Sequence, residues 1–374
     1  MIEKMRVNYN YLPDEFKNHK KIFIEWKKLI KTSEFTLGYK VLEFEKKFAN
    51  YIGVKHCIST NNGTDAIILS LKALGIKKGD EVITVCNSFY ATAGAIAACD
   101  ATPVFVDCDE RYQIDIEQVK TKISKKTKVI MPVHWGGASP DMQQLSKIAK
   151  KNNVHIVEDA CMGIGAKING KSPGTFGTVN AFSMHPLKSL NVMGDGGMVV
   201  TNNTKIFNWL KKYRNHGMIN RDKIDFWGVN ARLQPLQAVV AIEGLKKIDK
   251  LVQRRNYNAK ILDKGLKKLF PNVILPSRKK NYLETFALYM GRFKKRDKLK
   301  KFLNQKKIDT KIHYPIPLHL QKPGVGLGYR RGNFKSSEYQ AKELLTLPVH
   351  QYLTKSQLNY IIKNINLFYK REKN

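Results

Sequence analysis

The chain has few cysteines, few acidic residues and no long apolar run. Its five cysteines among 374 residues form no CxxC pair and no metal-ligand spacing, so the sequence predicts neither a disulfide framework nor a metal centre. We expect buried free thiols in a reducing compartment. The first residues lack an apolar signal segment, and no run reaches the length of about 18 residues that spans a bilayer. These absences predict a cytoplasmic protein without a membrane partner.

The shortage of acidic residues leaves a large positive charge. Lys and Arg number 66 against 31 Asp and Glu, which gives a formal net charge of +35. Such an excess attracts phosphates, nucleic acid or an anionic membrane surface. The lysines recur in short clusters along the whole chain, without a basic stripe interleaved with aromatics and without a helix-turn-helix, zinc-finger or RNA-binding signature. We therefore expect the charge to favour anionic small molecules, and we do not expect nucleic acid as a partner.

What is present indicates an α/β protein of two domains. Hydrophobic residues make up 43% and aromatic residues 10% of the chain, as in globular proteins of this size. From about residue 55, short runs rich in Val and Ile alternate with helical patterns, which is typical of a mainly parallel sheet covered on both faces. A long helical pattern after Pro235 leads out of this region. We predict a large domain over residues 1–245 and a smaller C-terminal α+β domain over residues 246–374.

Three groups follow predicted strands, where open α/β sheets bind their ligands. Gly63 and Thr64 lie in a Gly-containing turn that leads into a helix, whose N-terminal N–H groups and dipole favour a phosphate. Asp159 ends the run "VHIVEDA", and Lys188 follows "VNAFSMH". Taken singly, these are ordinary features of a helix cap, a turn and a solvated cation. Together, a phosphate anchor, a carboxylate and a lysine are what pyridoxal 5'-phosphate requires.

At this point the chain resembles the DegT/DnrJ/EryC1/StrS family of sugar aminotransferases, a branch of the fold-type-I pyridoxal-phosphate enzymes. The resemblance covers nearly the whole chain and rests on motifs that include "NGTDA", "GDEVITVCNSFYATAGAI", "VEDA", "FSMHPLKSLNVMGDGGMVVTN", "GVNARLQPLQA" and "HYPIPLHLQ". It implies a mainly parallel seven-stranded sheet in the large domain and pyridoxal 5'-phosphate as cofactor. It also implies transfer of an amino group from an amino acid, L-glutamate, to a keto group of a nucleotide-linked deoxysugar, with C3 favoured over C4.

The resemblance assigns the central roles residue by residue. Lys188 is expected to bind the cofactor covalently and then to carry the proton between the two carbons of the reaction. Asp159 is expected to pair with the pyridine nitrogen of the cofactor. Gly63 and Thr64 match contacts to the cofactor phosphate, and Ser183 matches a further phosphate ligand.

Further roles are expected around the ring, at a subunit interface and near the substrate. Phe89 matches the aromatic residue that stacks on the pyridine ring. Asn230 matches an asparagine that reaches the phosphate from a neighbouring subunit, which implies a homodimer with shared active sites. His185, Tyr314 and His319 lie in motifs near the substrate, although a Pro-bounded loop such as "HYPIPLH" can also need its Tyr and His for packing.

Two positions bear on the choice among functions. Where the family commonly has Gln, this chain has Met162, which cannot donate a hydrogen bond to the phenolic oxygen of the cofactor. Dehydratase members of the family have His in place of the catalytic lysine, whereas this chain keeps Lys188, so the aminotransferase branch is favoured. A C4 aminotransferase, a sugar dehydratase, and a regulatory or nucleic-acid-binding protein on the same scaffold remain as alternatives.

Overall fold

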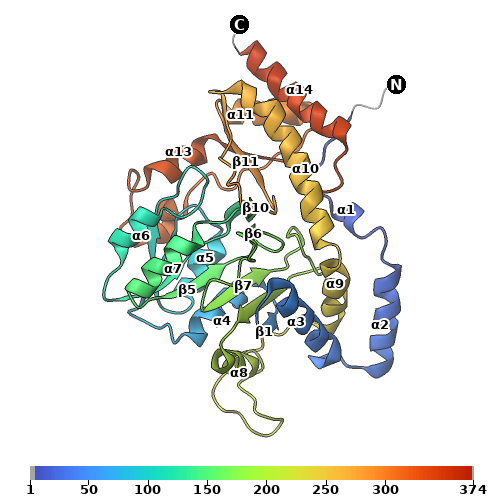
Figure 1. Ribbon diagram of the computed structural model, residues 1–374, viewed down its shortest axis with the longest axis vertical. Coiled ribbons are helices and arrows are strands. Elements are labelled where there is room, and N and C mark those ends of the chain that lie inside the picture. Colours follow the sequence, from blue (N-terminus) through green and yellow to red (C-terminus); the bar gives the residue numbers. More distant parts are fainter. Residues whose placement is uncertain (1–4, 373–374) are drawn as a thin grey trace.

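The centre of the computed structural model, which describes residues 5–372, is a seven-stranded sheet (Figure 1). Its order is β1-β8-β7-β5-β4-β2-β3. The strands are β1 (His56–Thr60), β2 (Glu81–Val85), β3 (Thr102–Val106), β4 (Thr127–Met131), β5 (His155–Asp159), β7 (Val179–Ser183) and β8 (Gly197–Thr201). Strand β8 is antiparallel to both of its neighbours, and the remaining pairs are parallel. The predicted mainly parallel α/β sheet is confirmed.

Helices cover both faces of this sheet because alternate residues of its strands point to opposite sides. In β7, Phe182 packs in a core with Phe48 of α3 (Gly38–Ile52) and Ala238 of α9 (Pro235–Leu245), whereas the adjacent Ala181 packs with Ile67 of α4 (Gly63–Ala73). The helices of this part are α1 (Leu12–Glu15), α2 (Lys20–Thr32), α3 (Gly38–Ile52), α4 (Gly63–Ala73), α5 (Tyr90–Ala97), α6 (Ile116–Lys122), α7 (Met142–Lys151), α8 (Thr204–Tyr213) and α9 (Pro235–Leu245).

The C-terminal part is built on a small antiparallel sheet of order β12-β11-β9. Its elements are α10 (Ile248–Leu266), β9 (Val273–Ile274), β11 (Tyr289–Phe293), α11 (Arg296–Gln305), α12 (Lys322–Gly326), α13 (Lys335–Glu343), β12 (Leu344–Leu347) and α14 (Lys355–Arg371). A two-stranded pair, β6 (Lys167–Ile168) with β10 (Tyr282–Leu283), joins it to the large sheet region.

The helical pattern after Pro235 forms two helices, because the chain turns between α9 and α10. Helix α10 runs from the sheet region toward the end of the molecule where both termini lie (Figure 1). Its early residue Val252 packs in the core of the large sheet, whereas Leu262 packs in the C-terminal core. Val7 also packs in the C-terminal core and pairs with Ile308. The division at residue 245 stays a prediction, and the segment around Val7 packs across it.

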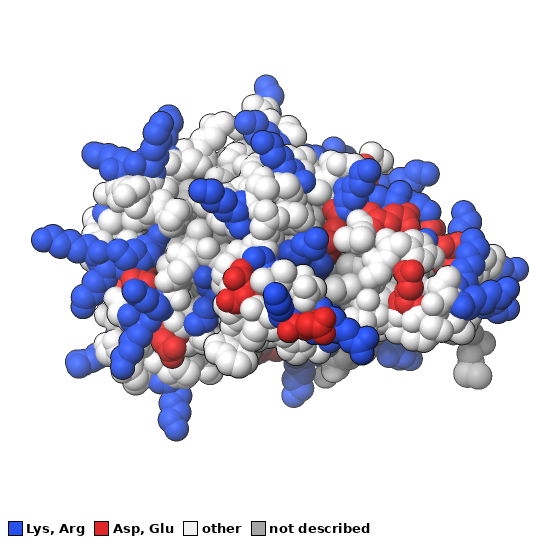
Figure 2. Space-filling view, turned by 90° about the horizontal axis from the view of Figure 1, so that it is seen from below, with Lys and Arg blue, Asp and Glu red and all other residues white. Residues whose placement is uncertain are grey.

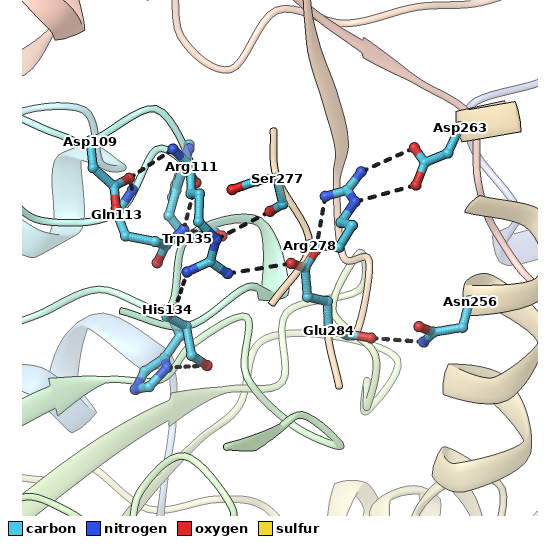
Figure 3. Close-up of polar contacts among 11 residues, drawn as sticks. Asp109, Arg111, Gln113, His134, Trp135, Asn256, Asp263, Ser277, Arg278 and Glu284 are labelled. Atoms are coloured by element: carbon cyan, nitrogen blue, oxygen red, sulfur yellow. Dashed lines mark hydrogen bonds and ion pairs between the residues drawn. The ribbon is translucent and has the colours of Figure 1, made fainter. Parts of the chain in front are cut away.

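A buried polar network adds to the contact between the two parts (Figure 3). Arg111 and Arg278 approach the carboxylate of Glu284 from opposite sides, with N–O distances of 3.5 and 3.0 Å. Arg278 also pairs with Asp263 of α10 at 3.3 Å. Of these ion pairs, Arg111–Glu284 joins segments on opposite sides of residue 245, and both of its side chains are buried, so it helps to hold the two parts together.

Charged side chains are spread over the surface. In Figure 2, Lys and Arg side chains project around the whole outline, with Asp and Glu side chains between them, and they do not gather into one stripe on that face. Within residues 5–372, no helix combines the length and apolar character needed to pass through a bilayer.

Candidate active site

A cavity of about 260 Å³ opens beside the carboxyl ends of β5 and β7. All but two of the residues predicted for the site line it: Gly63, Thr64, Phe89, Asp159, Ser183, His185, Lys188 and Tyr314. Asn230 and His319 lie outside it. The cavity therefore brings together side chains from five separate segments of the chain.

Asp159 is buried at the end of β5 and is held by several hydrogen bonds. Its carboxylate accepts from Thr92 Oγ1 at 2.7 Å and from the Cys161 N–H at 3.3 Å. Its own N–H donates to the Pro132 carbonyl at 2.9 Å, and its carbonyl accepts from the His134 N–H at 3.0 Å. A carboxylate fixed in this way presents a negative charge in one direction, as pairing with a protonated ring nitrogen requires.

Behind Asp159, the buried side chain of Glu158 holds the neighbouring loop. One carboxylate oxygen accepts from the N–H groups of Phe176 at 2.7 Å and Gly177 at 2.8 Å. The other accepts from the Gly174 N–H at 2.8 Å and from His134 Nε2 at 2.9 Å. Since a carboxylate can only accept, His134 carries its proton on Nε2. The strand end that carries Asp159 is thus anchored from behind.

Lys188 lies in the loop after β7, where its N–H donates to the His185 carbonyl at 2.8 Å. The Tyr11 hydroxyl donates to the Lys188 carbonyl at 3.3 Å. Burial lowers the pKa of Lys188, although Cys161 and Asp159 oppose this shift. The shift favours the uncharged amine, which is the nucleophilic form. His185 lines the cavity beside it, and burial together with the charge of Lys188 lowers the pKa of its imidazole.

The N-terminus of α4 and the end of β7 form a close-fitting anion cradle. The Asn62 side chain caps α4 by accepting from the Asp65 N–H at 2.8 Å. A Cβ atom at Gly63 would lie 2.6 Å from the Cβ of Ser183, so only glycine fits there. The neighbouring N–H groups, with the hydroxyls of Thr64 and Ser183, offer donors to a phosphate. Together with Lys188 and Asp159, this donor set fits pyridoxal 5'-phosphate.

Aromatic rings form another wall of the cavity. Tyr314 lies 5.9 Å from Phe89, 5.5 Å from Tyr90 and 5.7 Å from Trp135, measured between ring centroids. Burial raises the pKa of Tyr314 to about 12, so its hydroxyl stays protonated at neutral pH. Met162 also lines the cavity, and its side chain supplies no hydrogen-bond donor there.

The two predicted residues outside the cavity have other contacts. His319 is fully buried, and its Nε2 donates to the Glu338 carboxylate at 3.0 Å. The same carboxylate accepts from the Gly332 N–H at 2.7 Å, so this pair holds the loop before α13. Asn230 is exposed, and its side-chain oxygen accepts from Arg232 Nε at 2.9 Å. Neither residue reaches the cavity of its own chain.

Several cavity residues had no role in the sequence prediction. Thr92 lies three residues after Phe89 in the quoted motif "NSFYATA", and His313 directly precedes Tyr314, so both were within reach of a motif-based prediction. Trp135 and His350 end the runs "KVIMPVHW" and "LLTLPVH" and follow β4 and β12, so a motif-based prediction could have included them as well. Tyr9, Tyr11 and Arg255 follow no strand or motif that marked a site.

Residues 17–366 match the model of the DegT/DnrJ/EryC1/StrS aminotransferase family. The chain belongs to this family. A relative from Geobacillus stearothermophilus, named "Pleiotropic regulatory protein", is 38% identical, and the match covers 91% of this chain and 92% of the relative. The dTDP-3-amino-3,6-dideoxy-alpha-D-galactopyranose transaminase of Aneurinibacillus thermoaerophilus is 35% identical, and that match covers 91% and 93% of the two chains.

Solved structures of similar proteins have the same fold. S. venezuelae DesV superposes with a TM-score of 0.94 at 32% identity, covering 97% of this chain and 98% of that chain. NtdA from Bacillus subtilis, solved with the bound cofactor PMP, superposes with a TM-score of 0.92 at 28% identity, covering 98% and 86% of the two chains. The family and these neighbours confirm the predicted fold type, the predicted aminotransferase activity and the predicted cofactor, pyridoxal 5'-phosphate.

Proposed function

We propose that this family member moves an amino group from L-glutamate to the C3 keto group of a nucleotide-linked deoxysugar, for the amino sugars of O-antigen or other glycoconjugates. The observation that carries the proposal is the meeting of Lys188, Asp159 and the N-terminus of α4 at one cavity. The Aneurinibacillus relative, whose name places the amino group at position 3, supports C3 over C4. The net charge of +35 supports an anionic diphosphate substrate.

The residues divide the reaction between them. Pyridoxal 5'-phosphate supplies, when bound, an electron sink for the bond that breaks at the α-carbon of the donor. Asp159 would keep the ring nitrogen of the bound cofactor protonated through its fixed negative charge. Lys188 would hold the cofactor, and its amine, once free, would carry the proton between the two carbons of the 1,3-prototropic shift. Gly63, Thr64 and Ser183 would hold the phosphate, and Phe89 would cover the ring.

The expected assembly is a homodimer in which Asn230 of one subunit completes the site of the other. Asn230 follows the exposed loop after α8, which stands clear of the rest of the chain at the bottom of Figure 1. Large apolar side chains in this loop are exposed, with Trp227 at 88%. A contact between subunits would cover such side chains. The cytoplasm is the expected location, because the five cysteines are free thiols.

The decisive test compares Lys188→Ala with Lys205→Ala, which changes an exposed lysine of α8. Purified wild type and Lys205→Ala should be yellow with lysine-bound cofactor and should aminate a keto sugar in a panel of dTDP-, UDP- and GDP-linked substrates with L-glutamate. Lys188→Ala should lose both properties. NMR then gives the aminated carbon, and a new amine at C4 would contradict the assignment to C3.

The alternatives give different results in the same panel. A dehydratase would release a deoxygenated sugar without a new amine. The name of the Geobacillus relative favours a test of the regulatory alternative as well. A colourless protein that takes up no added cofactor, yet binds DNA with a steep salt dependence, would overturn the enzymatic proposal.

A further inference from the structure

A buried arginine without a carboxylate partner lies in the wall of the cavity. Arg255 of α10 is 2% exposed and lines the cavity. Its guanidinium donates to Gln351 Oε1 at 3.0 Å, to the Tyr11 hydroxyl at 3.0 Å and to the Phe286 carbonyl at 3.5 Å. All three acceptors are neutral, and no carboxylate of residues 5–372 forms an ion pair with this guanidinium.

This environment differs from that of the other buried arginines in the described part of the chain. Each of those pairs with a carboxylate: Arg111 with Glu284, Arg214 with Glu45, and Arg296 with Asp297. A buried charge without a counter-ion is costly, and proteins normally pair it. Since a guanidinium has five N–H donors and Arg255 uses three, two remain for a ligand.

The neighbours of Arg255 do not neutralise it. Gln351, which accepts from Arg255, donates to the carboxylate of Glu15 at 2.8 Å. The side chain of Gln351 therefore separates this carboxylate from the guanidinium of Arg255. Burial, and to a smaller extent the charge of Arg255, lower the pKa of His350 to about 4. Burial raises the pKa of Tyr9, so its hydroxyl does not ionise. The cavity wall at this point therefore has a net positive charge at neutral pH.

Arg255 is close to the catalytic lysine and comes from a different element than the phosphate cradle. The Tyr11 hydroxyl that accepts from Arg255 donates to the carbonyl of Lys188 at 3.3 Å. The cradle at Gly63 belongs to α4, whereas Arg255 belongs to α10. The cavity thus offers a second anion site, separate from the one that fits the cofactor phosphate.

We propose that Arg255 binds a carboxylate of the amino donor, an inference that rests on the proposed function. A guanidinium matches a carboxylate with two parallel hydrogen bonds. In an amino acid the α-carboxylate lies next to the reacting carbon, whereas the diphosphate of a nucleotide sugar is separated from the keto carbon by the sugar ring. A buried charge close to Lys188 therefore suits the amino donor.

The test uses the cofactor-loaded protein and two probes, L-glutamate in turnover and glutarate in calorimetric binding. Arg255→Gln removes the charge, and Arg255→Lys keeps it without the planar fork. The matched control is Arg254→Gln, since Arg254 is adjacent on α10 but donates to the Leu353 carbonyl at 2.9 Å and lies over the ring of Tyr257. Glutarate needs no turnover, so its binding also separates this proposal from the proposed function.

Arg255→Gln should raise the Kd of glutarate and the KM of L-glutamate about 10- to 100-fold, equivalent to about 1.4 to 2.8 kcal/mol. The KM of the nucleotide sugar should not change. For Arg255→Lys, the Kd of glutarate and the KM of L-glutamate should lie between those of wild type and Arg255→Gln, and for Arg254→Gln both should stay within about twofold of wild type. Two further probes show which carboxylate binds to Arg255. 4-Aminobutyrate keeps only the γ-carboxylate of glutamate, and L-2-aminobutyrate keeps only the α-carboxylate. The probe whose binding is weakened in Arg255→Gln carries the carboxylate that Arg255 holds.

Two results would overturn the proposal. A rise in the KM of the nucleotide sugar with unchanged glutarate binding would assign Arg255 to a phosphate. Unchanged KM values and unchanged glutarate binding in both Arg255 variants would make it a structural residue. If glutarate binds through Arg255 but no keto sugar is aminated, the proposed function fails while the carboxylate site stands.

Discussion

The replacement Glu158→Gln tests how much the hydrogen bonds of the Glu158 carboxylate, next to Asp159, contribute to the stability of the protein. The carboxylate of Glu158 accepts four hydrogen bonds, and all four donors are buried with it or part-buried. A glutamine has one acceptor oxygen, so its NH2 group must face two of these donors. If the NH2 group replaces the oxygen that faces His134 and Gly174, the imidazole can change tautomer and accept a hydrogen bond from it at Nε2. The Gly174 N–H, however, then has no acceptor. At least one charge-assisted bond is lost, which costs about 1.5 to 3 kcal/mol.

Urea unfolding of the cofactor-loaded protein measures this cost. We expect the free energy of unfolding of Glu158→Gln to fall by that amount, with an unchanged m-value. Glu117→Gln is the control, because Glu117 is exposed and pairs with Lys120 on the surface of α6 at 2.6 Å, and its loss should cost no more than about 0.5 kcal/mol. An unfolding midpoint of Glu158→Gln equal to that of wild type would refute the argument.

Three further predictions concern the site and its pH dependence. Gly63→Ala should weaken cofactor binding by at least about tenfold in an equilibrium titration, because the new Cβ would meet Ser183 at 2.6 Å; unchanged binding would contradict the tight cradle. Met162→Gln should tighten cofactor retention by about 1 kcal/mol, measured by dialysis against wild type, since the amide adds one donor. Burial lowers the pKa of His350 from its usual value of 6.5 to about 4, so the unfolded chain binds the extra proton between these values. Stability should therefore rise with pH from about 4 to 6.5, and this rise should be smaller in His350→Asn when unfolding is followed across that range.

The sequence predicted the large sheet well because its signals are local. Runs such as "DEVITVC" and "TPVFVDC" correspond to β2 and β3, and Asp159 and Lys188 could be located because they follow such runs. The helical pattern after Pro235 predicted helices but missed the turn between α9 and α10, since both Lys246 and Lys247 are compatible with a helix. Gly244, in the last turn of α9, is a local signal at this point, but a single Gly inside a helical pattern does not by itself mark a change of direction.

Cavity residues that come from distant segments could not be predicted in the same way. Tyr11 and Arg255 meet through a hydrogen bond across 244 positions of the chain, and no local pattern carries that information. His319 is the opposite case, since a motif pointed to it but it does not line the cavity. Its ring is buried and bonds to Glu338 instead. Sequence motifs located the strand ends, whereas the packing of the N-terminal segment and α10 decided which other side chains reach the cavity.

The N-terminal segment also has a consequence for the folding of the protein. Tyr9 and Tyr11 line the same cavity as Pro348 and His350, and Val7 pairs with Ile308. His350 Nε2 also lies 3.1 Å from the Asn8 carbonyl, a contact that spans 342 positions of the chain. Contacts of such long sequence separation form slowly, because the loop between the two segments must close first. We therefore expect this wall of the cavity to form late in folding, after the local contacts of the large sheet.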